Sequence, residues 1–296
     1  MTQIIASLAS IQGRYRAVLC DLWGCLHNGV AAFPEAVAAL RGFRATGGKV
    51  ILLTNAPRPK PPVVAQLDRL GVPRDAWDEV VTSGDAAQYA LLTGAVGRRV
   101  YHLGPEKDLT FFTEFADDLQ AIRASEPPID RVPLDQAEGI VCTGLFDDLT
   151  ETPDDYRATL LFAKTKGLKM LCANPDIMVD LGEKRIFCAG ALAQAYEEMG
   201  GEALYFGKPH PPIYDLARRR LAAMAGVLPD DEILCIGDGI GTDIRGGQGE
   251  GLDTLFVTGG LAAGLFGPDA PPDAQLLEAW LAEQGQNPTF TAPSLR

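Results

Sequence analysis

Two aspartates follow directly after apolar segments that have the length of buried strands. Asp21 comes after Ala-Val-Leu-Cys at residues 17–20, and Asp238 comes after the apolar run at residues 232–237. A carboxylate at the end of a strand can attack phosphorus or carbon, and it is a ligand that hard cations such as Mg²⁺ prefer. An aspartate after a strand is also a common helix N-cap, so neither residue is diagnostic by itself.

Further polar residues follow two other apolar segments. Thr54 and Asn55 come after residues 49–53, and Lys208 comes shortly after residues 203–206. Neutral donors could bind phosphoryl oxygens and an ammonium could offset their charge, although turn formation and a solvated surface lysine are the plain alternatives. Because parallel strands end at one edge of a sheet, we expect all these side chains to converge there with the two aspartates and with Asp243.

Apolar strand-like segments alternate with helical segments through most of the chain, which indicates an α/β fold with a doubly wound parallel sheet. Roughly 150 residues separate Thr54-Asn55 from Lys208, far more than one crossover needs, so we predict an inserted second α/β domain. Residues 1–15 are expected to form a packed or frayed helix. The segment after residue 271 is expected to hold one helix, at 274–282, followed by unstructured polar residues.

The composition excludes several classes of partner and compartment. The net charge is −13 and the sequence pI is near 4.7, which disfavours nucleic acids and anionic membranes as partners. No apolar run reaches the roughly 18 residues that a membrane span requires. The six cysteines show no C-x-x-C pairing and lie in apolar segments, which favours the reducing cytoplasm.

Taken in order, these motifs resemble those of the haloacid dehalogenase (HAD) superfamily of phosphohydrolases. The series is an aspartate, Thr-Asn, Gly-Lys-Pro and Gly-Asp-x-x-x-x-Asp. Finer details resemble its class IIA, NagD-like branch, and the resemblance extends from about Arg16 to Gly260. These details are the Leu-Leu-Thr-Asn form at residues 52–55, Asn174-Pro175-Asp176 and Thr242-Asp243-Ile244.

The resemblance implies a HAD-like, Rossmannoid core at residues 1–82 and 188–296, with an inserted α/β cap domain at 83–187. It implies a Mg²⁺-dependent phosphatase that hydrolyses a small phosphorylated metabolite through an aspartyl-phosphate, and it leaves open a homo-oligomer formed through the cap. The implied roles are Asp21 and Lys208 in catalysis, Thr54, Asn55 and Lys208 in phosphate binding, and Asp21, Asp238, Asp243 and the main-chain carbonyl of Trp23 in metal binding.

Trp23 departs from the family pattern, because most of the family's phosphatases have an aspartate two residues after the nucleophile. That aspartate is a general acid and base, a role that contributes about 10²- to 10⁴-fold in rate. We therefore expect a slow phosphatase, or one restricted to good leaving groups, unless His27 or His210 supplies the proton. The alternatives are a hydrolase of carbon–halogen or phosphonate bonds and a non-catalytic protein that binds a phosphometabolite.

Overall fold

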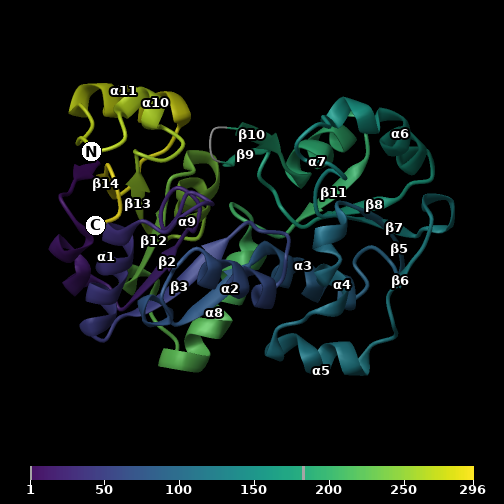
Figure 1. Cartoon of the computed structure of the whole chain (residues 1–296), viewed down its shortest axis with the longest axis horizontal. Helices are drawn as coiled ribbons and strands as arrows, with labels where there is room; N and C mark the ends of the chain where they lie inside the picture. Colours follow the sequence, from purple (N-terminus) through teal and green to yellow (C-terminus); the bar gives the residue numbers. More distant parts are fainter. Residues whose placement is uncertain (1, 182–183) are drawn as a thin grey trace. The chain divides into compact units, whose positions relative to one another are not determined.

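The computed structural model describes residues 2–181 and 184–296, which divide into two compact units. The first unit contains the residues up to Thr54 together with Gln66–Val81 and Tyr214–Arg296. The second unit contains Asn55–Ala65 and Thr82–Ile213. The ribbon in Figure 1 identifies the helices and strands of both units.

A seven-stranded sheet forms the centre of the first unit, and its strands from β1 to β3 pair in parallel. In spatial order its strands are β1 (Gln3–Ile4), β14 (Phe290–Ala292), β13 (Asp253–Val257), β12 (Ile233–Gly237), β2 (Ala17–Cys20), β3 (Lys49–Thr54) and β4 (Glu79–Thr82). Every residue of β2 and β12 is buried, as expected for strands that are covered on both faces. The predicted doubly wound parallel sheet is confirmed.

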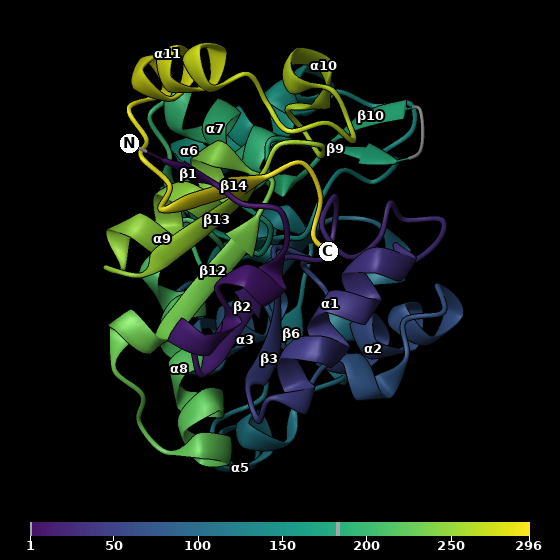
Figure 2. The ribbon, with the colours of Figure 1, turned by 90° about the vertical axis from the view of Figure 1, so that its left-hand side faces the viewer.

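Helices cover both faces of this sheet. They are α1 (Pro34–Ala45), α8 (Pro211–Ala225), α9 (Arg245–Gly249), α10 (Ala263–Phe266) and α11 (Ala274–Gln284), with α2 (Lys60–Arg69) spanning the boundary between the units. Figure 2 shows α1 on one side of the sheet and α9 on the other. The chain therefore leaves the neighbouring strands β2 and β12 in opposite directions, which creates a switch point at their carboxyl ends.

The sequence of α1 explains its position. Pro34 occupies the first turn, where a missing N–H costs nothing, and the helix ends before Gly47, which has a φ of 92°. Its buried residues, among them Ala36, Leu40 and Phe43, recur at helical spacing and form one apolar face.

A second parallel sheet organises the second unit. Its strands, in spatial order, are β11 (Glu202–Tyr205), β8 (Lys169–Cys172), β7 (Gly139–Cys142), β5 (Arg99–Leu103) and β6 (Asp130–Arg131). The helices are α3 (Ser83–Leu92), α4 (Thr110–Thr113), α5 (Asp117–Ser125), α6 (Arg157–Thr165) and α7 (Ala189–Glu198), and β9 (Met178–Leu181) and β10 (Lys184–Phe187) form an antiparallel pair. Adjacent residues Ile140 and Val141 of β7 belong to different buried clusters, so both faces of this sheet are packed.

The strand before Lys208 corrects one prediction. The sequence assigned residues 203–206 to the core sheet and returned the chain to the core at residue 188. In the structure β11 pairs with β8, with Ala203 opposite Met170, and the second unit continues to Ile213. Buried parallel strands have similar apolar sequences, so the local pattern does not identify the sheet that a strand joins.

Both chain ends also differ from their predictions. In place of the helix expected at residues 1–15, the structure has β1 and two short 3₁₀ turns at Leu8–Ser10 and Gln12–Arg14. β1 pairs with β14, which lies in the part of the tail expected to be unstructured, whereas the helix predicted at 274–282 is confirmed as α11. No helix within the described residues is long and apolar enough to cross a bilayer.

Candidate active site

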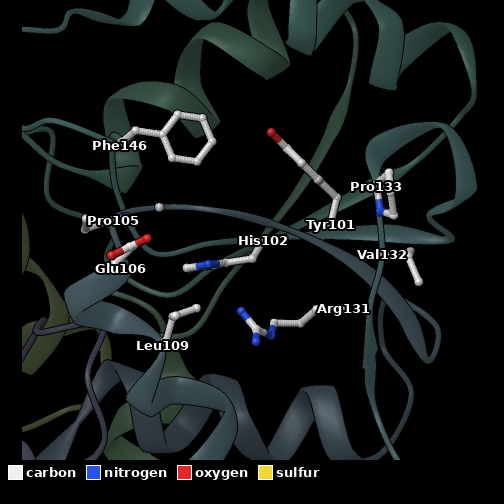
Figure 3. Close-up of a pocket in the computed structure, with 10 residues that line it drawn as sticks. Tyr101, His102, Pro105, Glu106, Leu109, Arg131, Val132, Pro133 and Phe146 are labelled. Atoms are coloured by element: carbon white, nitrogen blue, oxygen red, sulfur yellow. The ribbon is translucent and has the colours of Figure 1, made fainter.

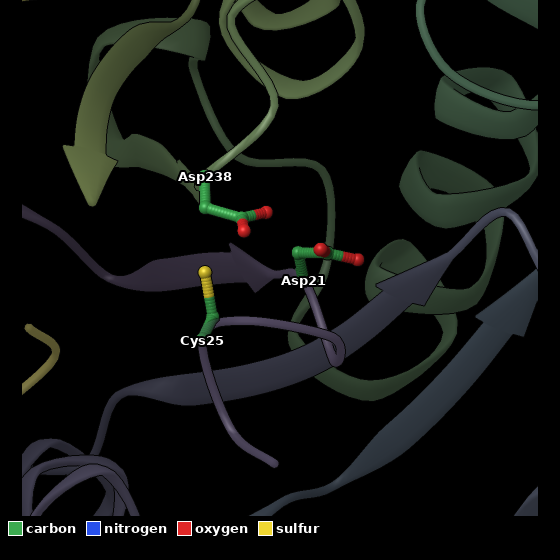
Figure 4. A group of neighbouring side chains, drawn as sticks. All are labelled: Asp21, Cys25 and Asp238. Atoms are coloured by element: carbon green, nitrogen blue, oxygen red, sulfur yellow. The ribbon is translucent and has the colours of Figure 1, made fainter. Parts of the chain in front are cut away.

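Two carboxylates and a thiol meet at the carboxyl edge of the first unit's sheet. Asp21 follows β2 and Asp238 follows the adjacent β12, and the Asp21 main-chain N–H donates to Ile236 O over 2.9 Å. Ligand atoms of Asp21, Cys25 and Asp238 all lie within 4.8 Å of one another, and all three residues are buried (Figure 4). The structure thus brings together the two aspartates whose convergence was predicted from parallel strands.

The Asp238 carboxylate lies in a tight recess made by two glycines. A Cβ added to Gly24 would lie 2.0 Å from Asp238 Oδ2, and one added to Gly260 would lie 2.1 Å from the same atom. Gly24 also has a φ of 73°, a conformation that side-chain-bearing residues rarely adopt. The Leu261 main-chain N–H donates to Asp238 Oδ2 over 2.9 Å, so backbone on two sides fixes the position of this carboxylate.

Asp243 supports the loop that carries Asp238. It lies in the helical turn Ile240–Ile244, and its Oδ2 accepts a hydrogen bond from the Gly239 N–H over 3.0 Å. A Cβ at Gly237 would lie 2.0 Å from Asp243 Cγ, so close packing against the strand end requires a glycine there. Its ligand atoms are not among those within 4.8 Å of one another. This position fits a residue that orients the loop, whereas the family resemblance implied a metal ligand.

The donor set fits a hard divalent cation. Two buried carboxylates this close together repel unless a positive charge lies near them, and carboxylate oxygens are the ligands that Mg²⁺ prefers. Burial raises the pKa of the Cys25 thiol well above its usual value, and the charges of Asp238 and Asp21 raise it further. A thiol is a soft ligand and Mg²⁺ prefers hard oxygen ligands, so the ligands of a Mg²⁺ site would come mainly from the two aspartates.

Trp23 lies in the loop that follows Asp21, packed against His27. Their rings are 5.2 Å apart in an edge-to-face arrangement, and a Cβ at Gly29 would lie 2.5 Å from the indole. Burial lowers the pKa of His27 to about 4, and its Nδ1 accepts the Gly29 N–H over 3.1 Å. A neutral imidazole is a weak proton donor near pH 7, which argues against His27 as the substitute acid. His210 stacks on the Tyr205 ring in the second unit.

Asn55 holds the main chain of Lys208 within the second unit. Its Nδ2 donates to the Lys208 carbonyl over 3.0 Å and to Asp176 Oδ1 over 2.8 Å, and its Oδ1 accepts the Lys208 N–H over 2.7 Å. Both amide hydrogens of Asn55 therefore already have acceptors. The predicted contact of Asn55 with phosphate would have to use its main-chain N–H. A Cβ at Gly207 would lie 2.5 Å from Asn55 Oδ1, which explains the glycine before the lysine.

Two of these residues were not assigned a role from the sequence. Asp176 belongs to the Asn-Pro-Asp triplet, which contributed only to the family resemblance, and the structure shows its carboxylate bound to Asn55. Cys25 lies four residues after Asp21, but a buried thiol in an apolar segment gives no signal of its own. Thr54 ends β3 in the first unit as predicted and is buried.

Comparisons with known proteins match the chain to hydrolases. A family model described as haloacid dehalogenase-like hydrolase matches residues 18–116, and one for HAD-like hydrolases matches residues 205–296. The ribonucleotide monophosphatase NagD of Escherichia coli is 27% identical over 248 residues, covering 83% of this chain and 88% of NagD. The D-glycerol 3-phosphate phosphatase of Mycobacterium tuberculosis is 28% identical over 293 residues, covering 98% and 72%.

A solved structure gives the strongest of these likenesses. The crystal structure of a haloacid dehalogenase-like hydrolase from Brucella suis is 40% identical in sequence, covers 99% of this chain and 100% of its own, and has a TM-score of 0.85. The predictions of a hydrolase and of NagD-like relatives are both confirmed. Asp21 and Asp238 lie close together at the switch point of the sheet. Since the sequence identity extends over the full length, the chain belongs to the haloacid dehalogenase-like hydrolase family, in its NagD-like branch.

Proposed function

We propose that this protein is a Mg²⁺-dependent phosphatase that hydrolyses small phosphorylated metabolites through an aspartyl-phosphate on Asp21. The observation that supports it most is the pair of buried carboxylates of Asp21 and Asp238 at the ends of adjacent strands. The relatives named as a ribonucleotide and a glycerol phosphate phosphatase support the same reaction class. The six buried free cysteines support the cytoplasm as its compartment.

The chain's own residues divide the reaction between them. Asp21 would attack phosphorus with a carboxylate oxygen as the bond to the leaving oxygen breaks, and water would then hydrolyse the acyl phosphate. Bound Mg²⁺, held by Asp21, Asp238 and the Trp23 carbonyl, would supply the positive charge that an anionic attack on an anionic group needs. Asp243 would orient the loop, and Lys208 would offset phosphoryl charge with Thr54 as a neutral donor.

Protonation of the leaving oxygen is the step for which Trp23 offers no carboxyl group. General acid catalysis contributes about 10²- to 10⁴-fold, which corresponds to roughly 3 to 5 kcal/mol of barrier. We therefore propose slow turnover of alkyl phosphates and faster turnover of aryl phosphates, whose leaving groups need no proton. The indole is large enough to stack on a flat part of the substrate.

The test is a turnover screen with nucleoside monophosphates, glycerol 3-phosphate and p-nitrophenyl phosphate, each with Mg²⁺ and with EDTA. Asp21→Asn should abolish turnover without unfolding the protein, because the change is isosteric. Asp231→Asn, at the opposite end of the same pair of strands, is the matched control and should retain full activity. Substantial turnover by Asp21→Asn would remove that residue as nucleophile. Equal activity in EDTA would favour a metal-free hydrolase, and binding without turnover would favour a sensor.

A further inference from the structure

A hollow of about 630 Å³ lies in the second unit, beside the edge strand β6 (Figure 3). Its walls come from the carboxyl-terminal half of β5, from the segment after β6 and from the loop after β7. All of its lining residues belong to one unit, and none of them is among the residues assigned to phosphate or metal binding.

The hollow exists because β6 is too short to cover β5. The Val132 N–H donates to the Val100 carbonyl over 3.0 Å, and Pro133, which has no N–H, then takes the chain out of the sheet. Alternate residues of β5 face β6, so the main-chain N–H and carbonyl of His102 face the uncovered edge. Within residues 2–181 and 184–296 neither group has a main-chain hydrogen-bond partner on that side.

The charges around the hollow sum to zero. Arg131 places its guanidinium 5.6 Å from the centroid of the Phe112 ring and makes no ion pair with any described residue. Glu106 contributes one negative charge at the opposite end of the lining. Burial, and then the nearby charge of Arg131, lower the pKa of His102 to about 4, so this ring is neutral near pH 7. Its Nε2 already lies 2.9 Å from Thr143 Oγ1.

Two other charged side chains near the hollow are already paired. Asp108 is buried and lies 3.9 Å from the Arg58 guanidinium, and Lys107 lies 2.5 Å from the Asp148 carboxylate. Arg131 therefore stands out as the cation that a ligand could pair with. Because the negative charge of Glu106 offsets the positive charge of Arg131, the lining favours a ligand with one negative charge over a phosphate monoester with two.

Aromatic rings line the other side of β5. Tyr101 and His102 are successive residues of the strand and so point to opposite faces, as Figure 3 shows. The Tyr101 hydroxyl makes no hydrogen bond to any described residue, and Phe146 nearby is 47% exposed. Both rings line the hollow, and the Phe146 ring also packs on Tyr156 with its centroid 5.7 Å away, so the hollow offers aromatic surface to another ring.

We propose that this hollow is a binding site for a small aromatic carboxylate. The carboxylate would accept hydrogen bonds from the Arg131 guanidinium and the His102 main-chain N–H, and the ring would pack against Tyr101 and Phe146. A guanidinium presents paired donors to a carboxylate, and ordering by the Phe112 ring reduces the entropy lost on binding. The ligand is distinct in charge from the phosphate esters of the proposed reaction.

The test is a fluorine NMR titration of the full-length protein with 4-fluorophenylacetate. Saturating inorganic phosphate is present throughout, to keep the probe away from phosphate-binding groups. The wild type should bind the probe with a millimolar or lower dissociation constant. Arg131→Ala should weaken binding at least tenfold, and Arg131→Lys should recover only part of the loss because it lacks the planar fork. Arg99→Ala is the matched control, since Arg99 is an exposed arginine of β5 that is not part of the lining.

Three results would overturn this proposal: no binding by the wild type in the presence of phosphate, equal weakening in Arg131→Ala and Arg99→Ala, or binding of the probe that is seen only when phosphate is left out. Phe146→Ala serves as a second variant should Arg131→Ala fold poorly, because it removes a partly exposed ring that the ligand would pack against, and it should weaken binding two- to threefold. The readout is binding alone. An inactive protein that binds the probe would refute only the phosphatase proposal, and an active one that does not would refute only this site.

Discussion

Replacing Asn55 by alanine should displace Lys208 while leaving the metal site of the first unit intact. The substitution removes three hydrogen bonds, two to the Lys208 main chain and one to Asp176. Lys208 is only 3% exposed, so its N–H and carbonyl would lose the Asn55 hydrogen bonds where water has little access. The same change would leave one oxygen of the Asp176 carboxylate without this donor.

The expected magnitude follows from these lost bonds. A buried polar group without a partner costs about 1 to 3 kcal/mol, so two groups on Lys208 predict a loss of roughly 2 to 6 kcal/mol in unfolding free energy. Water that enters the space left by the amide would move the value toward the lower end. A misplacement of about 1 Å can lower a rate by about 10²-fold, so we expect kcat on p-nitrophenyl phosphate to fall by about that factor.

The assay combines urea denaturation with steady-state kinetics, and Asn287→Ala at an exposed position is the control. Asn55→Asp should be at least as damaging, because it places a second carboxylate against Asp176. Adding Asp176→Asn to that variant exchanges donor and acceptor across the 2.8 Å contact and should restore part of both stability and kcat. The Lys208 carbonyl would still lack its donor, so recovery should be incomplete.

Two outcomes would refute this reasoning. A rise in KM with an unchanged kcat would mean that the Asn55 amide binds the phosphoryl group directly, as the sequence alone suggested. A double variant no better than Asn55→Asp alone would mean that the contact between residues 55 and 176 does not position the lysine.

Three further predictions concern other parts of the molecule. Gly260→Ala would place its Cβ 2.1 Å from Asp238 Oδ2 and should abolish both the rise in melting temperature on adding Mg²⁺ and most Mg²⁺-dependent activity. Gly264→Ala, with no atom within 4 Å of its Cβ, should preserve both. Trp23→Asp should raise the rate on alkyl phosphates by on the order of tenfold or more and leave the rate on p-nitrophenyl phosphate level, whereas a fall in both rates would assign the indole a positive role. Burial raises the pKa of Asp108 to about 6. Because its unfolded pKa is about 4, the native state holds a proton that the unfolded state releases between about pH 4 and 6, so stability is lost over that range as pH rises. Asp108→Asn should remove this loss, worth up to roughly 3 kcal/mol, and match the wild type at pH 4; urea midpoints at pH 4 and 8 with the same difference between the two proteins would contradict it.

The sequence predicted best the strands whose environment is the same on both faces. Residues of β2, β3 and β12 are almost all buried, and such strands have continuous apolar sequences that end where polar residues begin. The positions of Asp21 and Asp238 followed from those ends. Their proximity followed from the rule that parallel strands end at one edge.

The local sequence pattern could not predict which strands pair when they are distant in sequence. β1 has two residues, too few for any periodicity, and it pairs Gln3 with Phe290 at the opposite end of the chain. β11 has the apolar character expected of a core strand, yet its partner is β8. In each case the deciding interaction is with a strand distant in sequence, so propensity and periodicity carry no information about it.

The correction to β11 changes how the proposed chemistry is distributed. Asp21 and Asp238 are held by the first unit, whereas Lys208 and the Asn55 side chain that fixes its main chain are held by the second. Substitutions that disturb only the second unit should therefore lower turnover while Mg²⁺ still raises the melting temperature of the first. Asn55→Ala should lower turnover but keep the rise in melting temperature on adding Mg²⁺, whereas Gly260→Ala should abolish that rise. A loss of the Mg²⁺ response in Asn55→Ala would show that the metal site depends on the second unit as well.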